Sequence, residues 1–205
     1  MDVNNAESLK NLDVIVAPRI WFLPDEARAA IEQTVTNGAG LFIRDGLGCM
    51  EPGDDPDTSR LCGFEHSTFG YNPHPMECEV IASHPILGKL KLNQVISITP
   101  NGTWGKPLGQ TIPLVRVKDM DAFRDFEHRG QDDWTFYPVY ISQLGKGRII
   151  GCQFPAWEPM PKSLMSATDN EFNLRCVQWL AHRLDGAETS SPATRLATSS
   201  PTSRP

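Results

Sequence analysis

The feature that most restricts the fold is a strand–helix–strand unit between residues 13 and 44. Residues 13–18 (DVIVAP) form a continuous β-branched run ended by proline, which is typical of a strand buried on both faces of a parallel sheet. A helix is expected over residues 24–37, with Pro24 and two acids in its first turn and Gly38 after its end. Residues 41–44 (LFIR) are the next strand. Because such crossovers are right-handed, the two strands should be parallel neighbours in one sheet.

The rest of the chain extends this unit into an α/β domain. Strands are expected at residues 78–82, 95–99, 112–117, 134–141 and 148–154, and a closing helix at 169–184. The fold class predicted for residues 1–185 is a flavodoxin-like three-layer sandwich with a mainly parallel sheet and a strand-rich insertion. Residues 51–60 (EPGDDPDTSR) have the composition of an exposed loop. Residues 186–205 are rich in Ser, Thr, Pro and Ala, so we expect a disordered tail there.

Composition excludes two classes of partner. The 205 residues carry a formal net charge of -6, which gives no electrostatic reason to bind nucleic acid. No apolar run approaches the ~20 residues that a membrane-spanning helix needs, and the first residues lack the apolar core of a signal peptide. The five cysteines are scattered without a CxxC pair, which favours free thiols. We therefore expect a cytoplasmic protein without a membrane or nucleic-acid partner.

Several separated motifs, taken in order, resemble one family. They are residues 12–16 (LDVIV), 35–44 (VTNGAGLFIR), 61–63 (LCG) with His66, 84–86 (HPI), 145–148 (GKGR) and 179–180 (WL). Together they are similar to the class I glutamine amidotransferase-like superfamily, closest to its trehalose-utilisation (ThuA-like) branch. No cofactor is implied by this resemblance.

The resemblance also implies that the sheet lacks the first βα units of the family, because residue 13 begins what should be an interior strand. Three explanations stay open: another chain supplies those strands, the sheet is reduced and exposes a hydrophobic edge, or the reading frame is truncated. An exposed edge favours a homo-oligomer or a protein partner.

The family's catalytic positions are incompletely filled. Catalytic members carry a nucleophilic cysteine on a tight turn after a strand, where helix and backbone amides stabilise thiolate and oxyanion. That position falls here on Gly46, and Cys49 lies three residues later. The family's "QFHPE" segment corresponds to residues 153–158 (QFPAWE), which retain the acid as Glu158 but lack the histidine.

Two functions remain from these motifs. The first is a domain without amidotransferase activity that binds a small polar ligand, such as a carbohydrate, or a partner protein. The second is a cysteine-dependent amidohydrolase or glutaminase in which Cys49 acts with a loop histidine such as His66 and with Glu158.

The candidate ligand-binding residues are Asp45, Gly46, His66, His84 and Trp157. Asp45 follows a strand at its carboxyl end, where open α/β sheets bind ligands, although a turn or helix cap is an equally good explanation for this acid. The histidines also suit turn caps. The tryptophans at 104, 134 and 157 could form a sugar-stacking wall or belong to the core.

Residue type alone also raises the question of a metal site. Cys62, His66, His74 and Cys78 are ligands that suit tetrahedral zinc. Their spacing is less compact than that of zinc-finger knuckles, and Cys62 and His66 already occupy family loop positions. We therefore expect no metal.

Overall fold

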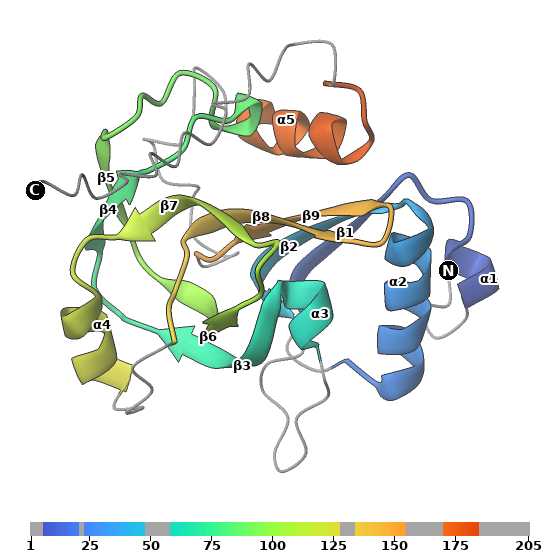
Figure 1. Cartoon of the computed structure of the whole chain (residues 1–205), viewed down its shortest axis with the longest axis horizontal. Helices are drawn as coiled ribbons and strands as arrows, with labels where there is room; N and C mark the ends of the chain where they lie inside the picture. The colour runs from blue at the N-terminus through green and yellow to red at the C-terminus, as the bar shows by residue number, and fades with distance from the viewer. Residues whose placement is uncertain (1–5, 21–22, 48–57, 128–133, 155–169, 185–205) are drawn as a thin grey trace, which may run out of the picture.

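The structure, a computed structural model, describes residues 6–20, 23–47, 58–127, 134–154 and 170–184 (Figure 1). Its strands are β1 (Val14–Ile20), β2 (Gly40–Leu47), β3 (Phe64–Tyr71), β4 (Met76–Val80), β5 (Val95–Ile98), β6 (Asn101–Pro107), β7 (Ile112–Val117), β8 (Val139–Leu144) and β9 (Gly147–Cys152). Its helices are α1 (Ala6–Leu9), α2 (Asp25–Asn37), α3 (Ser59–Cys62), the 3-10 turn η1 (Pro85–Leu87), α4 (Met120–Glu127) and α5 (Asn170–Leu180).

Seven strands form one sheet in the order β1-β2-β9-β8-β7-β4-β5. β1, β2 and β9 are parallel neighbours, whereas each of the remaining pairs is antiparallel. Five of the seven strands, β1, β2, β9, β7 and β5, consequently run in one direction. The predicted α/β fold class is confirmed, and so is the parallel β1–α2–β2 unit.

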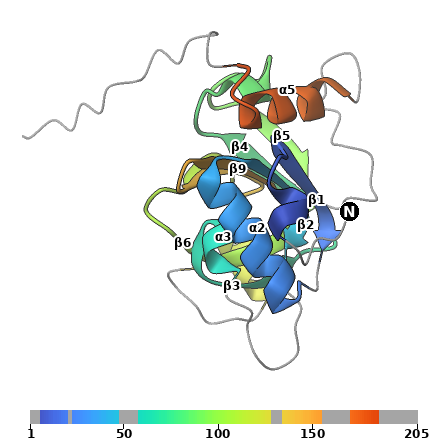
Figure 2. The same cartoon turned by 90° about the vertical axis from the view of Figure 1, so that its right-hand side faces the viewer.

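Alternation along the central strands divides the core between the two faces of the sheet. Leu41, Ile43 and Ile149 are buried in a cluster with α2, whereas Phe42 and Ile150 are buried in a cluster with α5. Figures 1 and 2 show α5 on one side of the sheet, with α2 and α3 on the other. Because successive side chains point to opposite faces and both faces are covered, the central residues of β2 and β9 are apolar at consecutive positions, 41–43 and 149–150.

A second sheet of two antiparallel strands, β3 and β6, lies below the first in Figure 1. The sequence pattern predicts neither strand, and it does not predict α4. The β6 residue Trp104 is fully buried and packs on Phe123 of α4, with ring centroids 5.1 Å apart. The small sheet therefore shares its core with α4.

Three of the element boundaries that differ from the sequence prediction have a clear structural reason. β1 does not end at Pro18 but continues to Ile20, since Pro18 lies on an edge strand where its missing N–H costs no ladder hydrogen bond. β2 runs to Leu47 and so includes Asp45, which the sequence pattern places in a turn. β8 begins at Val139 instead of residue 134, because Thr135 makes an isolated bridge to Gly105 of β6.

None of the helices in the described ranges has the length and hydrophobicity needed to cross a membrane. The tail expected at residues 186–205 lies outside the described residues.

Candidate ligand site at the carboxyl edge of the sheet

The carboxyl end of β2 carries a bulge. Pro18 of β1 pairs with Arg44 and Ile20 pairs with Leu47, so one residue of β1 faces two residues of β2. Those two residues, Asp45 and Gly46, both have positive φ, at 65° and 83°. Glycine adopts this conformation without strain, and aspartate is one of the few other residues that tolerate it. Bulges of this kind commonly re-aim side chains next to functional sites.

The bulge places the Asp45 carboxylate in the interior. Asp45 is 0% exposed, and its Oδ2 lies 3.8 Å from Nε of Arg19, whose side chain is 41% exposed. The sequence prediction that an acid stands at the carboxyl edge of the parallel strands agrees with this position. A buried carboxylate with a solvent-reaching guanidinium beside it combines an acceptor and a donor at one edge.

Two buried donors belong to strand residues near this edge, and the guanidinium of one of them, Arg44, lies over the Phe154 ring at 5.3 Å from its centroid. Nδ2 of Asn101, a residue only 1% exposed, and Nε of Arg44 have no hydrogen-bond partner within the described part of the chain. The Asn101 backbone N–H donates to the Gln153 carbonyl at 3.1 Å, directly after Cys152, the β9 partner of Arg44. Since leaving a buried donor unsatisfied costs about 1–3 kcal/mol, such groups usually face a ligand or water.

The Gln153 side chain joins the small sheet to this edge. Gln153 is fully buried; its Oε1 accepts from the Thr103 N–H at 2.6 Å, and its Nε2 donates to the Thr103 carbonyl at 2.7 Å. Gly102 makes room for this clamp, because a Cβ there would lie 2.0 Å from Gln153 Oε1. The motif resemblance includes Gln153, but only the structure shows that it positions β6.

Cys62 is a described thiol beside the carboxyl end of β2. Its Sγ is 3.5 Å from the Leu47 carbonyl, and the residue is completely buried. Burial raises the pKa of the Cys62 thiol to about 11, with hydrogen bonds to the Thr103 and Thr58 side chains opposing the shift. At neutral pH roughly one Cys62 in 10,000 is then a thiolate, so Cys62 does not replace the nucleophile that Gly46 lacks.

Two further residues named from the sequence, His84 and His66, belong to other elements of the fold. His84 lies beside Trp179 (ring centroids 5.0 Å apart), and the same indole lies under Arg148 near the amino-terminal end of β9. His84 Nδ1 accepts from the Ile86 N–H at 3.4 Å and so caps η1. His66 belongs to β3, where its backbone pairs with Lys106.

Cys49, Trp157 and Glu158 lie outside the described residues. The structure therefore brings together Asp45 and Gly46 from the candidate set and adds Arg19, which lies 3.8 Å from Asp45. Arg44 and Asn101 lie on neighbouring strand positions, Arg44 next to Asp45 on β2 and Asn101 beside Gln153 at the end of β9. No local pattern in the sequence distinguishes these three residues, since each reaches its position through strand pairing.

The four residues considered for zinc do not form a cluster. Cys62 is part of the core on the α2 side, and Cys78 is part of the core on the α5 side. Burial raises the pKa of the Cys78 thiol to about 12. Trp104 and Trp134 are also no sugar-stacking wall, because their rings contact each other (centroids 6.2 Å apart) and Trp104 is fully buried.

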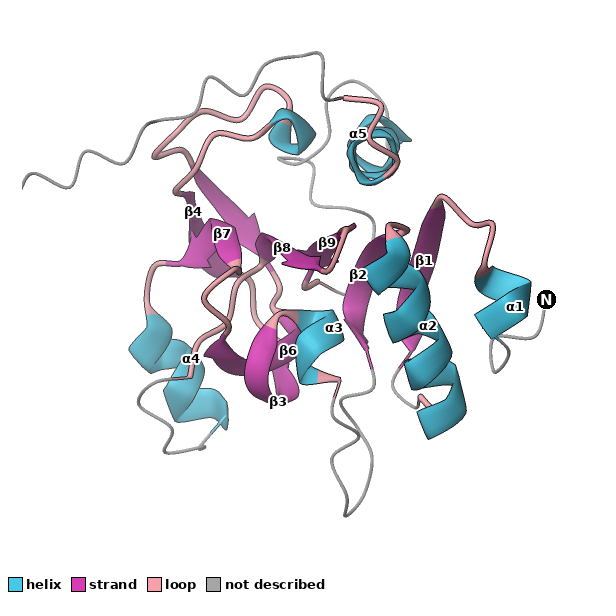
Figure 3. Ribbon diagram, turned by 45° about the vertical axis from the view of Figure 1, so that its right-hand side comes forward, coloured by secondary structure: helices cyan, strands magenta, loops and turns pink. Residues whose placement is uncertain are grey.

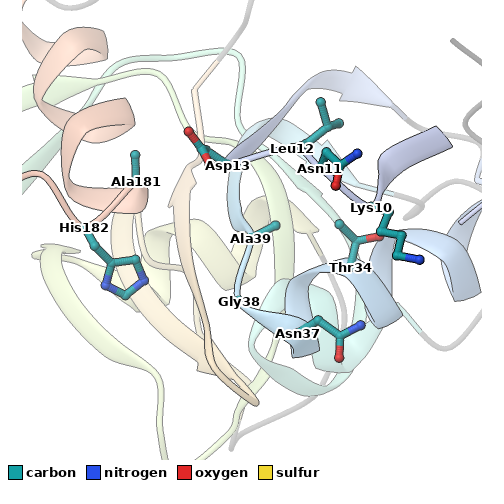
Figure 4. A pocket seen from close by; sticks show the side chains of 10 residues that line it. All are labelled: Lys10, Asn11, Leu12, Asp13, Thr34, Asn37, Gly38, Ala39, Ala181 and His182. Carbon is teal, nitrogen blue, oxygen red and sulfur yellow. The ribbon is translucent and has the colours of Figure 1, made fainter. Parts of the chain in front are cut away.

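A separate cavity of about 450 Å³ lies at the opposite, amino-terminal edge of the sheet (Figure 4). The labelled residues come from the starts of β1 and β2 and from the ends of α2 and α5, and they include Asp13, Asn37 and His182. Ligands of open α/β sheets bind at the carboxyl ends of the strands. A substitution in this amino-terminal cavity can therefore serve as a control for substitutions at the carboxyl edge.

Comparison with known proteins identifies the fold. No protein-family model matches the chain, and no curated protein matches its sequence. Among solved structures, a protein from Bacteroides uniformis described as ThuA-like aligns over 88% of this chain and 74% of its own, with 17% identity and a TM-score of 0.56. Two cytoplasmic proteins from Salmonella typhimurium align over 86% of this chain and 75% of theirs, with 13% identity and TM-scores of 0.52 and 0.55. The chain therefore has a ThuA-like fold.

Proposed function

We propose that this chain, a domain of ThuA-like fold, is a non-catalytic cytoplasmic protein that binds a small polar ligand at the carboxyl edge of β1, β2 and β9. The observation that carries the proposal is the Asp45–Gly46 bulge, which puts a buried carboxylate directly beside Gly46, the position at which the motif resemblance expects the nucleophile. Glycine at the second position offers no nucleophile.

The chemistry of the edge favours a ligand rich in hydroxyl groups. The Asp45 carboxylate accepts hydrogen bonds, whereas Asn101 Nδ2, Arg44 Nε and the Arg19 guanidinium donate them. A sugar hydroxyl can donate to the first and accept from the others, so vicinal hydroxyls match this set. The proposal therefore commits to a mono- or disaccharide as the ligand class. Asp45 is buried and lies beside Arg19, so part of its role is to hold the Arg19 side chain in position for the ligand.

Binding can be tested by isothermal titration with a panel of mono- and disaccharides that includes trehalose. We expect at least one sugar to bind the wild type and to bind Asn101→Ala and Asp45→Asn at least tenfold more weakly. Asparagine at 45 keeps the positive φ accessible, so this variant removes the charge with little backbone strain.

The matched control is Asn37→Ala, which alters the cavity at the amino edge of the sheet instead. Unchanged affinity in that variant is expected. Equal weakening by Asn37→Ala, or no binding by any sugar in the panel, would contradict the proposed site.

The cysteine-hydrolase alternative predicts a different result. It requires glutamine or amide hydrolysis by the wild type that is lost in Cys49→Ala. We expect neither protein to hydrolyse glutamine, since the position of the nucleophile is Gly46 and the Cys62 thiol is protonated.

A further inference from the structure

β1 is the last strand at its end of the seven-stranded sheet, and no described strand pairs with its outer side (Figure 3). The Gly40 N–H donates to the Asp13 carbonyl at 2.8 Å, which fixes the direction of the β1 backbone groups. Because these groups alternate, Ile15 and Ala17 also face β2, and residues 14, 16 and 18 direct their polar groups outward.

The outward positions are apolar. Val16 is 51% exposed, one of the few large hydrophobic side chains in the described ranges that are more than half exposed. Pro18 removes one outward donor but keeps its carbonyl acceptor. An outer partner strand must therefore tolerate one missing N–H.

We propose that this edge binds the same edge of a second copy of the chain, in an antiparallel β1–β1 pair centred on Val16. In that register Val16 lies opposite Val16, and residue 14 lies opposite Pro18 of the other copy. Two hydrogen bonds join the Val16 pair, and each Val14 N–H donates to a Pro18 carbonyl. Four backbone hydrogen bonds form, and the two absent proline donors fall at the ends of the ladder, away from the twofold axis.

Opposite charges at the two ends of β1 favour this register. They also favour a second copy of the chain as the partner that binds this edge. Asp13 and Arg19 are each three residues from Val16, so the twofold axis sets Asp13 of each copy opposite Arg19 of the other. Arg19 has φ 48° and lies beyond the ladder, so it meets Asp13 through its side chain, which is 41% exposed and whose Nε lies 3.8 Å from Asp45, beyond hydrogen-bond distance. Asp13 contacts Arg183 at 3.4 Å, but both side chains are more than 70% exposed, and pairs of that kind are weak.

Sedimentation velocity of the full chain tests the proposal. We expect a dimer for the wild type and a monomer for Val16→Lys. The matched control is Val95→Lys at the other edge of the same sheet, where Val95 of β5 is 47% exposed. This control should remain dimeric. A monomeric wild type, or a dimer disrupted equally by both substitutions, would overturn the proposal.

Charge reversal tests the register. Asp13→Lys and Arg19→Glu each place like charges opposite one another in their homodimers, so each should dissociate. In a mixture of the two variants, the introduced lysine lies opposite the introduced glutamate, and the unaltered Arg19 of one copy lies opposite the unaltered Asp13 of the other. The heterodimer should therefore form. Failure of the mixture to associate, with both variants folded by circular dichroism, rejects this register.

Should Arg19→Glu not fold, cross-linking gives an independent answer. Opposed cysteines in the Val16→Cys variant would have Cα atoms about 5.5 Å apart, within the range of a disulfide. In a Cys49→Ser background, mild oxidation should cross-link Val16→Cys and leave Val95→Cys as single chains. An uncross-linked Val16→Cys dimer would show that another surface mediates association.

Discussion

His84 illustrates a residue whose role in the structure is set by its neighbours and not by its reactivity. Its ring caps η1 and packs edge-on against Trp179. Burial, assisted by the positive charge of Arg148, lowers the pKa of His84 to about 4. A neutral histidine in this position suits a structural role at neutral pH.

This pKa predicts a pH dependence of stability. Between about pH 6.5 and 4 the unfolded state takes up a proton at His84 and the folded state does not, so the free energy of unfolding falls as the pH is lowered. The loss attributable to His84 should be on the order of 1–2 kcal/mol, allowing for screening by nearby water. Urea denaturation from pH 7 to 4 measures it. His84→Asn keeps a capping acceptor without titrating, and a slope unchanged in that variant would assign the effect to other groups.

Cys62 supports a second prediction at the residue scale. Because burial raises the pKa of its thiol to about 11, alkylation by iodoacetamide at pH 8 should be at least a hundredfold slower in the native protein than in urea. Peptide mapping after a timed reaction measures this ratio. Fast labelling of native Cys62 would show that the α3 region opens readily, and would reopen the possibility of thiol chemistry at this edge.

At the scale of elements, the sheet of β3 and β6 depends on the side chain of Gln153, the residue that directly follows β9. Replacing Gln153 by leucine preserves its size but leaves the Thr103 N–H and carbonyl buried without their partners. We expect Gln153→Leu to lower the free energy of unfolding by roughly 2–5 kcal/mol. Gln143→Leu on β8 is the matched control, because the Gln143 amide bonds the Gly145 carbonyl at the exposed surface. Similar urea midpoints for both variants would contradict the claim that the Gln153–Thr103 hydrogen bonds stabilise the small sheet.

The elements differ in how well the sequence predicts them, for a physical reason. The β1–α2–β2 unit is visible because its apolar spacing and its Gly38 terminus are local signals. β3 and β6 are not, because β6 contains two glycines and a proline, and its position depends on Gln153 fifty residues away. A nonlocal hydrogen bond leaves no periodic pattern in either segment.

The residues of the candidate site also differ in how well the sequence predicts them. Asp45 and Gly46 could be named because an acid and a glycine directly follow an apolar run, and this placed them at the carboxyl edge of a strand. Arg44, Asn101 and Arg19 could not, since each is an ordinary polar residue until strand pairing brings it there. The register of a sheet is fixed by burial of whole faces, which no single residue reveals.

At the scale of the whole molecule, the two core clusters share the central strands of the seven-stranded sheet. The α2 side contains Leu41, Ile43 and Ile149, and the α5 side contains Phe42 and Ile150, so β2 and β9 contribute to both. Loss of packing on one face of β2 and β9 therefore removes part of the burial that fixes the register of both strands. The described residues of the two clusters should therefore unfold together.

This coupling can be measured because the described tryptophans, at 104, 134 and 179, all belong to the α5-side cluster. Ile31 of α2 belongs to the other cluster and is 3% exposed. Ile31→Ala should cost about 2–5 kcal/mol, as typical for a buried isoleucine. In a Trp21→Phe, Trp157→Phe background, tryptophan fluorescence and far-ultraviolet circular dichroism should shift to one lower urea midpoint together. A fluorescence midpoint that stays in place while circular dichroism shifts would mean that the two faces unfold independently, and that β2 and β9 do not transmit the loss of packing.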